Sequence, residues 1–260
     1  MAWPTGPVAT VTFPGTAGRQ LVGDLREVSR EQIVILAHGF TSNRRSRGRF
    51  PRLEDELARR GISSLAFDFG GCGESDDALL TLDSHVGDLE AAVAFANARG
   101  FHHVALLGHS LGSLVCLHAN TPDVRTMVLT GALTGPMDYR WSDYYSAEQL
   151  EELARTGRLV VRHADGSRRE TTVGADLLRV FANVEPSTLL SNVRCPVLLV
   201  LGDGDDEERQ LLEHARRALP RLPDGSRLQV IAGAPHGFGE AYELVIDLVA
   251  GWLVASLRQS

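Results

Sequence analysis

The residues whose types and spacing best suit catalysis lie in the segment Gly108–Gly112, Gly-His-Ser-Leu-Gly. A serine hydroxyl is a poor nucleophile until a base accepts its proton, so it must be exposed and rigidly aimed. The apolar run Val104–Leu107 predicts a strand before Ser110, and Leu111–Ala119 predicts a helix after it. A sharp turn between the two exposes the serine, and glycines are needed on either side because side chains there would collide with the strand and the helix. We expect Ser110 to be a catalytic nucleophile; the alternative is a small-residue turn without a catalytic role.

A histidine able to serve as the base follows much later in the chain. His236 lies in a loop after the predicted strand Arg227–Ile231, and it is the only one of the nine histidines that follows a late core strand. A neutral imidazole at a strand end can accept the serine proton and return it to a leaving group. We expect His236 to act first as general base and then as general acid.

Three aspartates follow the predicted strand Pro196–Leu201, where a carboxylate could orient the histidine and stabilise its protonated form. We favour Asp205 for this role, with Asp203 as the alternative, and expect Asp206 to cap the helix Glu207–Leu219. A solvated acidic loop is the other interpretation of this run. The serine, Asp205 and the histidine then follow in the chain order expected of a triad on an α/β sheet.

Backbone N–H groups near the serine could stabilise a reaction intermediate. Acyl transfer places negative charge on the former carbonyl oxygen, and preformed donors must meet that charge. The segment His38-Gly39-Phe40 ends the predicted strand Ile33–Ala37. We expect the N–H groups of Phe40 and Leu111 to form this oxyanion hole. His38 is expected to be structural, with its ring hydrogen-bonded to the loop.

Short apolar runs alternate with longer amphipathic ones, a pattern typical of a mostly parallel sheet flanked by helices. The 260 residues are enough for a single α/β domain spanning residues 1–260. An antiparallel hairpin is predicted over Val8–Phe13 and Gln20–Leu25. The further predicted elements are the strands Ile33–Ala37, Ile62–Phe67, Val104–Leu107, Thr126–Thr130, Pro196–Leu201 and Arg227–Ile231, and the helices Arg49–Arg60, Leu111–Ala119, Glu207–Leu219 and Gly239–Leu257, with one more that Asp83 caps.

Residues 133–185 break this alternation and contain many aromatic, acidic and arginine residues. We predict a short helix at Ala147–Arg155 and strands at Arg158–Arg162 and Arg168–Val173. An insertion of this size between two core strands indicates a cap over the carboxyl edge of the sheet. Its candidate pocket residues, which could instead only attach the cap to the domain, are Met137, Tyr139, Trp141, Tyr144 and Tyr145.

The composition narrows the class of partner. The hydrophobic fraction of 43% is that of an ordinary globular protein, and the net charge of −7 argues against nucleic acid or an anionic membrane as the main partner. Three widely spaced cysteines indicate neither a disulfide framework nor a metal site. The N-terminus lacks the pattern of a signal peptide, and no apolar run reaches membrane-spanning length. We expect a cytoplasmic protein with a small-molecule partner.

Three segments together resemble the cinnamoyl/feruloyl-esterase-like branch of small esterases with the α/β-hydrolase fold. They are residues 38–44 (His-Gly-Phe-Thr-Ser-Asn-Arg), 67–75 (Phe-Asp-Phe-Gly-Gly-Cys-Gly-Glu-Ser) and 108–112. The resemblance covers nearly the whole chain and implies a triad of Ser110, Asp205 and His236, with an oxyanion hole from the N–H groups of Phe40 and Leu111. It also implies no cofactor, and a small inserted cap that shapes the acyl pocket.

The chain departs from that pattern in two places. Cys72 stands where the glycine-rich loop commonly carries a histidine, and we expect a structural role for this cysteine rather than a reactive thiol. The usual hydrophobic-proline step after the acid is replaced by Glu207–Arg209, which leaves Asp203 in competition with Asp205. The basic run Arg44–Arg47 is expected to be a solvated loop, with contact to an anionic substrate group as the alternative.

These observations predict a serine hydrolase that cleaves a carboxylic ester through an acyl-enzyme on Ser110. The same triad would also serve a thioesterase, acyltransferase, lactonase, amidase or C–C hydrolase, because acyl chemistry is shared and the cap selects the substrate. Dehalogenases and epoxide hydrolases are disfavoured, because their family pattern has an aspartate at the position of Ser110. A hydrolase-fold binding protein without catalysis is the non-enzymatic alternative.

Overall fold

The computed structural model describes residues 6–119, 121–163 and 168–258. Residues 1–5 lie outside the described residues; they belong to the N-terminal stretch in which no signal peptide was expected. The strands of the central sheet are β1 (Val8–Pro14), β2 (Gln20–Arg26), β3 (Gln32–Ala37), β4 (Ser63–Phe67), β6 (His103–His109), β7 (Val124–Thr130), β10 (Val197–Gly202) and β11 (Arg227–Ile231). They form an eight-stranded sheet in the order β1-β2-β4-β3-β6-β7-β10-β11. The hairpin partners β1 and β2 are antiparallel, as are β2 and β4, and the other neighbouring strands are parallel. The predicted α/β class is confirmed.

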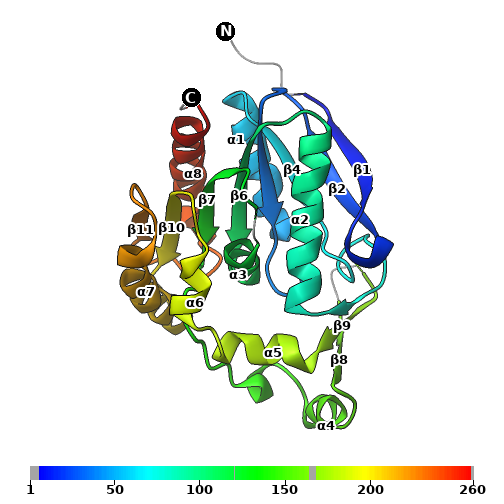
Figure 1. Ribbon diagram of the computed structural model, residues 1–260. Helices are drawn as coiled ribbons and strands as arrows, with labels where there is room; N and C mark the ends of the chain where they lie inside the picture. Colours follow the sequence, from blue (N-terminus) through cyan, green and yellow to red (C-terminus); the bar gives the residue numbers. More distant parts are fainter. Residues whose placement is uncertain (1–5, 120, 164–167, 259–260) are drawn as a thin grey trace.

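Helices cover both faces of this sheet (Figure 1). One face packs against α1 (Arg49–Arg59) and α8 (Tyr242–Leu257). The other packs against α2 (Leu82–Ala98), α3 (Leu111–His118), α6 (Pro186–Ser191) and α7 (Asp206–Ala218). Along β3 the side chains alternate between the two cores: Ile33 and Ile35 face one, and Val34 and Leu36 face the other. Burial on both faces explains why the central strands are continuously apolar in sequence.

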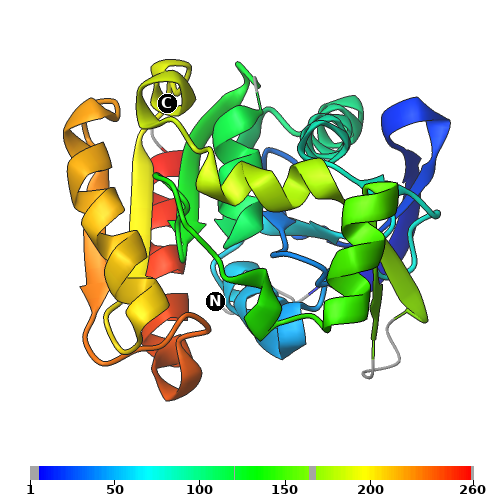
Figure 2. The same ribbon diagram turned by 90° about the horizontal axis from the view of Figure 1, so that it is seen from below.

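The insertion at residues 133–185 contains secondary structure of its own. Its elements are the 3-10 helix η3 (Trp141–Asp143), α4 (Ala147–Thr156), β8 (Arg158–Arg162), β9 (Glu170–Gly174) and α5 (Ala175–Ala182). The last of these was not predicted. β9 pairs with β8 and with the short strand β5 (Leu79–Leu80), so a second sheet joins the insertion to the glycine-rich loop region. Seen from below the sheet, α4 and α5 lie in front of its strands (Figure 2).

Two helix caps differ from expectation. Asp83 does not cap α2; Thr81 does, because its hydroxyl accepts from the Ser84 N–H at 3.1 Å while the Ser84 hydroxyl meets the Thr81 N–H. α7 begins one residue earlier than predicted, with Asp205 as its cap and Asp206 inside the helix. The second shift matters for the site, because Glu207 and Glu208 each stand one position further into the helix than predicted.

The remaining short 3-10 helices are η1 (Thr16–Gly18), η2 (Ser46–Gly48), η4 (Leu219–Arg221) and η5 (Gly239–Ala241). The last precedes α8, which therefore begins at Tyr242 rather than at Gly239. Within the described part of the chain, no helix combines the length and the apolar character needed to cross a membrane.

Candidate active site

Ser110 lies on a strained turn between β6 and α3. Its backbone has φ 55° and ψ −122°, a region that residues with a side chain rarely occupy. A Cβ on Gly108 would lie 2.4 Å from the Gly112 oxygen, and one on Gly112 would lie 2.2 Å from the Ala37 oxygen. Only glycine fits at both positions, which is the reason predicted from the sequence. The turn is held by the Ser110 N–H, which donates to the β7 carbonyl of residue 130 at 2.9 Å.

The segment after β3 lies directly against this turn. A Cβ on Gly39 would be 3.3 Å from the Cβ of Ser110, so the backbone leading into Phe40 passes close to the serine. Leu111 is the first residue of α3, where backbone N–H groups have no partner within the helix. The described residues include no acceptor for the N–H of Phe40 or Leu111. Both groups therefore have no backbone or side-chain partner among the described residues.

His236 follows β11 and receives its carboxylate partner from an unexpected residue. Its Nδ1 lies 2.6 Å from Oε1 of Glu208, which is fully buried in the first turn of α7. The other Glu208 oxygen accepts from the Gly202 N–H at 2.5 Å, so both carboxylate oxygens are held by hydrogen bonds. A neutral imidazole bonded this way carries its proton on Nδ1 and leaves Nε2 free to accept one. Gly131 permits the close approach, because a Cβ there would lie 2.6 Å from the His236 ring.

The structure does not place Asp205 against the imidazole ring. Its carboxylate accepts from the backbone N–H of His236 at 2.9 Å and from that of Glu208 at 2.7 Å. Asp203 likewise bonds backbone, accepting from the Gly233 N–H at 2.5 Å. Asp205 is the cap of α7, and a cap side chain is held by backbone donors one turn ahead. A glutamate three residues further on has the extra methylene and the direction needed to reach the ring.

Charges around His236 raise its pKa. Burial alone would lower the pKa, but the hydrogen bond to Glu208 and the charges of Glu207 and Glu208 outweigh burial and bring it above the ordinary value of 6.5. Oε1 of Glu207 lies 3.9 Å from His236 Nε2 and accepts from the Tyr139 hydroxyl at 2.6 Å. The pairing of Glu207 with Tyr139 joins the insertion to the histidine. In the sequence, both glutamates stood out only as a departure from the family pattern, and neither was expected to contact the histidine.

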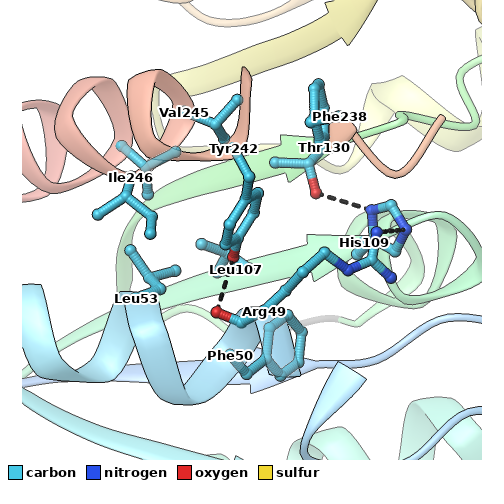
Figure 3. A pocket seen from close by; sticks show the side chains of 11 residues that line it. Arg49, Phe50, Leu53, Leu107, His109, Thr130, Phe238, Tyr242, Val245 and Ile246 are labelled. Carbon is cyan, nitrogen blue, oxygen red and sulfur yellow. Dashed lines mark hydrogen bonds between the residues drawn. The ribbon is translucent and has the colours of Figure 1, made fainter. Parts of the chain in front are cut away.

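A second histidine packs beside the first. The rings of His109 and His236 have centroids 5.0 Å apart. Burial, followed by the nearby charge of Arg49, holds the pKa of His109 well below its usual range. Arg49 reaches from α1 and donates to Nε2 of His109 at 3.0 Å, while Nδ1 of His109 meets the Thr130 hydroxyl (Figure 3). His109 is thus a neutral support for the His236 ring.

Ser110 and His236 line one pocket of about 410 Å³. Four of the five predicted insertion residues also line it: Tyr139, Trp141, Tyr144 and Tyr145. Met137 does not; it is 3% exposed and packs into the core beside Phe181. Arg47, from the basic run for which contact with an anionic substrate group was the alternative, also lines it. No pocket role was expected from the sequence for the other lining residues, which are Gly39, Thr41, Ser42, Arg49, His109, Phe181, Glu207 and Gly237.

The aromatic lining residues form one packed cluster. Tyr139 and Trp141 have ring centroids 5.4 Å apart, and both contact Phe181, at 5.2 and 5.7 Å. Phe40 joins the cluster through Trp141 at 6.1 Å and Phe181 at 5.8 Å. The segment that carries the Phe40 N–H is therefore packed against the insertion, and the pocket wall facing Ser110 is largely aromatic.

Three further expectations concern residues around the site. His38 is structural as predicted, since its Nδ1 meets the Gly39 carbonyl at 2.9 Å and its Nε2 accepts from the Phe69 N–H. Cys72 is buried, and burial raises the pKa of its thiol. The expectation of a solvated run at Arg44–Arg47 is wrong for Arg44, which is buried and paired with carboxylates. Among the described residues, no group of three or more potential ligands gathers that could hold a metal ion.

A mostly parallel sheet that presents a serine on a strained strand-to-helix turn defines the α/β-hydrolase class of folds. A family model described as "Alpha/beta hydrolase family" matches residues 34–248. The chain belongs to this family.

Solved structures with the same fold cover nearly the whole chain. Est1E from Butyrivibrio proteoclasticus, solved with ferulic acid bound, has a TM-score of 0.74 at 20% identity, covering 96% of this chain and 100% of its own. The alpha/beta hydrolase GrgF from a Penicillium species has a TM-score of 0.76 at 17% identity, covering 97% and 100%. A dienelactone hydrolase from Anabaena variabilis has a TM-score of 0.66 at 19% identity, covering 98% and 100%. No curated protein sequence matches this chain significantly.

Proposed function

We propose that this protein hydrolyses carboxylic esters through an acyl-enzyme on Ser110. The observation that carries the proposal is the meeting of two residues in one pocket: Ser110 on its strained turn, and His236 with its Nδ1 held by a buried carboxylate. This arrangement supplies a nucleophile, a base of fixed tautomer and two backbone donors on one face. The fold shared with solved structures described as esterases supports the same reaction class.

In the proposed reaction the Ser110 hydroxyl attacks the ester carbonyl while His236 Nε2 takes its proton. The oxygen of the tetrahedral intermediate accepts from the N–H groups of Phe40 and Leu111. Protonated His236 then gives its proton to the leaving alkoxide, which departs as the alcohol. Water enters, loses a proton to His236 and attacks the acyl carbon, so that the acid is released and Ser110 is regenerated.

We assign the orienting carboxylate to Glu208 in place of Asp205. Glu208 contacts the ring nitrogen that carries the proton, whereas Asp205 contacts only backbone. A negative charge at Nδ1 stabilises the imidazolium that forms when Nε2 is protonated. Asp205 acts as a positioning residue that fixes the His236 backbone and the start of α7.

We infer that the insertion acts as a cap and that its aromatic cluster receives the acyl or alcohol group. Flat aromatic walls favour a substrate with an aromatic or extended apolar part. Est1E has been solved with ferulic acid bound, which supports an aromatic acid as one acyl group to test. The proposed substrates are therefore small-molecule esters, with hydroxycinnamate esters and short 4-nitrophenyl esters as first probes.

The central test is the Ser110→Ala variant. The wild-type protein is expected to hydrolyse 4-nitrophenyl butyrate and to gain one fluorophosphonate adduct, which peptide mass spectrometry locates at Ser110. Ser110→Ala is expected to lose both the hydrolysis and the labelling while retaining the wild-type circular dichroism spectrum. Ser187→Ala, at an exposed serine on α6, is the matched control and should retain both. Undiminished hydrolysis by folded Ser110→Ala would overturn the proposal.

A further inference from the structure

Two guanidinium groups lie at one wall of the Ser110 pocket. Arg47 and Arg49 both line it. Arg49 donates to His109 Nε2, to the Ser46 carbonyl at 3.0 Å and to the Ser46 hydroxyl at 3.1 Å. All these partners are neutral, and within the described ranges neither Arg47 nor Arg49 forms an ion pair with a carboxylate. The wall therefore carries two positive charges without a compensating negative one.

Arg44, in the same segment, is an arginine whose positive charge is compensated by carboxylates of the chain. It is 6% exposed and pairs with three carboxylates, those of Asp24, Asp68 and Glu74. A partly buried cation such as Arg49 is costly unless an anion meets it, whereas Arg47 is exposed to solvent. The pKa of Arg49 is lowered by burial first and also by the neighbouring charge of Arg47. For half-buried Arg49, the contrast indicates that the anion comes from outside the chain.

The backbone that presents Arg47 is unusually shaped. Ser46, Arg47 and Gly48 have φ values of 44°, 56° and 84°, three successive residues in the left-handed region. Such conformations cost energy in residues with side chains and persist where the surroundings hold them. The hydroxyl of Ser46 also accepts from Arg49, so the turn and the second guanidinium are built as one unit.

We propose that Arg47 and Arg49 form an anion-binding subsite, and that the natural substrate is an ester that carries a carboxylate at a distance from the scissile bond. This inference rests on the proposed ester hydrolysis and adds the class of substrate. Among the described residues, Glu207 is the one carboxylate that lines the pocket, and it is hydrogen-bonded to Tyr139 in the insertion. It repels a second negative charge from that side, which directs the substrate carboxylate to the arginine wall.

The test compares two esters of the same acyl length. 4-Nitrophenyl hemiglutarate ends in a carboxylate, and 4-nitrophenyl pentanoate ends in a methyl group. We expect Arg47→Gln to lower kcat/KM for the hemiglutarate at least tenfold more than for the pentanoate. Arg45→Gln makes the same charge change at an exposed side chain that does not line the pocket, and it should leave both rates as they are. An equal effect of Arg47→Gln on the two esters would overturn the subsite.

A binding measurement separates this inference from the proposed reaction. Ser110→Ala protein titrated calorimetrically with glutarate should bind it, and should bind the neutral amide pentanamide at least tenfold more weakly. Adding Arg47→Gln should weaken glutarate binding at least tenfold. If the wild type cleaves neither ester but glutarate binding depends on Arg47, ester hydrolysis fails and the subsite stands. If glutarate binds no better than pentanamide, the subsite is wrong whatever the hydrolysis result.

Discussion

At the scale of single residues, Glu208 and Asp205 hold the same histidine by different bonds, so their effects can be separated. Glu208→Gln removes the charge beside Nδ1, and kcat/KM for 4-nitrophenyl butyrate should fall by about 10² to 10⁴-fold. Asp205→Asn keeps an oxygen for only one of the two backbone donors and should cost less than about tenfold, with a lower thermal midpoint. Steady-state kinetics and thermal unfolding of both variants measure this. A larger kinetic loss in Asp205→Asn than in Glu208→Gln would return the catalytic role to Asp205.

The pH dependence of the rate also belongs to this scale. Because the base must be neutral, kcat/KM should fall as the pH drops through the pKa of His236, which lies above 6.5. Glu207→Gln removes one of the charges that raise this pKa and retains an oxygen for Tyr139. The midpoint of the acidic limb should therefore move to lower pH, with Glu213→Gln, a surface position of α7, as the control. An unmoved midpoint would show that Glu207 does not act on the imidazole.

At the scale of elements, one arginine ties the insertion to the domain. Arg168, just before β9, donates to the carbonyls of Gly73 at 3.1 Å and Ser75 at 2.7 Å in the glycine-rich loop, and pairs with Asp77. Arg168→Ala should lower the free energy of unfolding by about 1 to 3 kcal/mol, because buried carbonyls lose a charged donor. Hydrogen exchange should rise in β8 and β9. Arg169→Ala, at the exposed neighbour, should change neither quantity.

The elements that could be predicted from the sequence are those governed by local rules. The strand, the sharp turn and the helix around Ser110 follow from apolar runs and from the collisions that glycine avoids, and the structure has them as expected. The partner of His236 could not be found this way, because it depends on which side chain of one helical turn points at a loop 28 residues away. The direction in which each side chain of that turn points depends on where α7 begins, and the sequence predicted that start one residue too late.

The insertion was harder for a related reason. Its short helix and strands were predicted near their observed places, but α5 was not, and Met137 faces the core instead of the pocket. A small segment packed against a larger body takes its inward and outward faces from that body rather than from its own periodicity. Tyr139 and Trp141 line the pocket while packing against Phe181, and Tyr145 stacks on Trp141.

At the scale of the whole molecule, a buried carboxyl on α1 sets part of the pH dependence of stability. Glu54 is 4% exposed and accepts from the Ser64 hydroxyl at 3.0 Å; burial raises its pKa to about 7. Above pH 4.5 the unfolded chain releases this proton while the folded chain keeps it, so stability is lost as the pH rises toward and through 7. Glu54→Gln stays neutral, and its stability relative to wild type should rise by up to about 3 kcal/mol between pH 5 and pH 8. Urea unfolding at the two pH values measures this; an equal difference at both would contradict a proton held on Glu54.

The first turn of α7 holds His236 twice, by its backbone through Asp205 and by its ring through Glu208. The base is therefore complete only when β10, α7 and the loop after β11 have come together at the far edge of the sheet, late in the chain. During refolding, the nucleophile turn between β6 and α3 can form before the residue that activates it. Turnover should thus return no earlier than the packing of α7 and the loop after β11 at that edge.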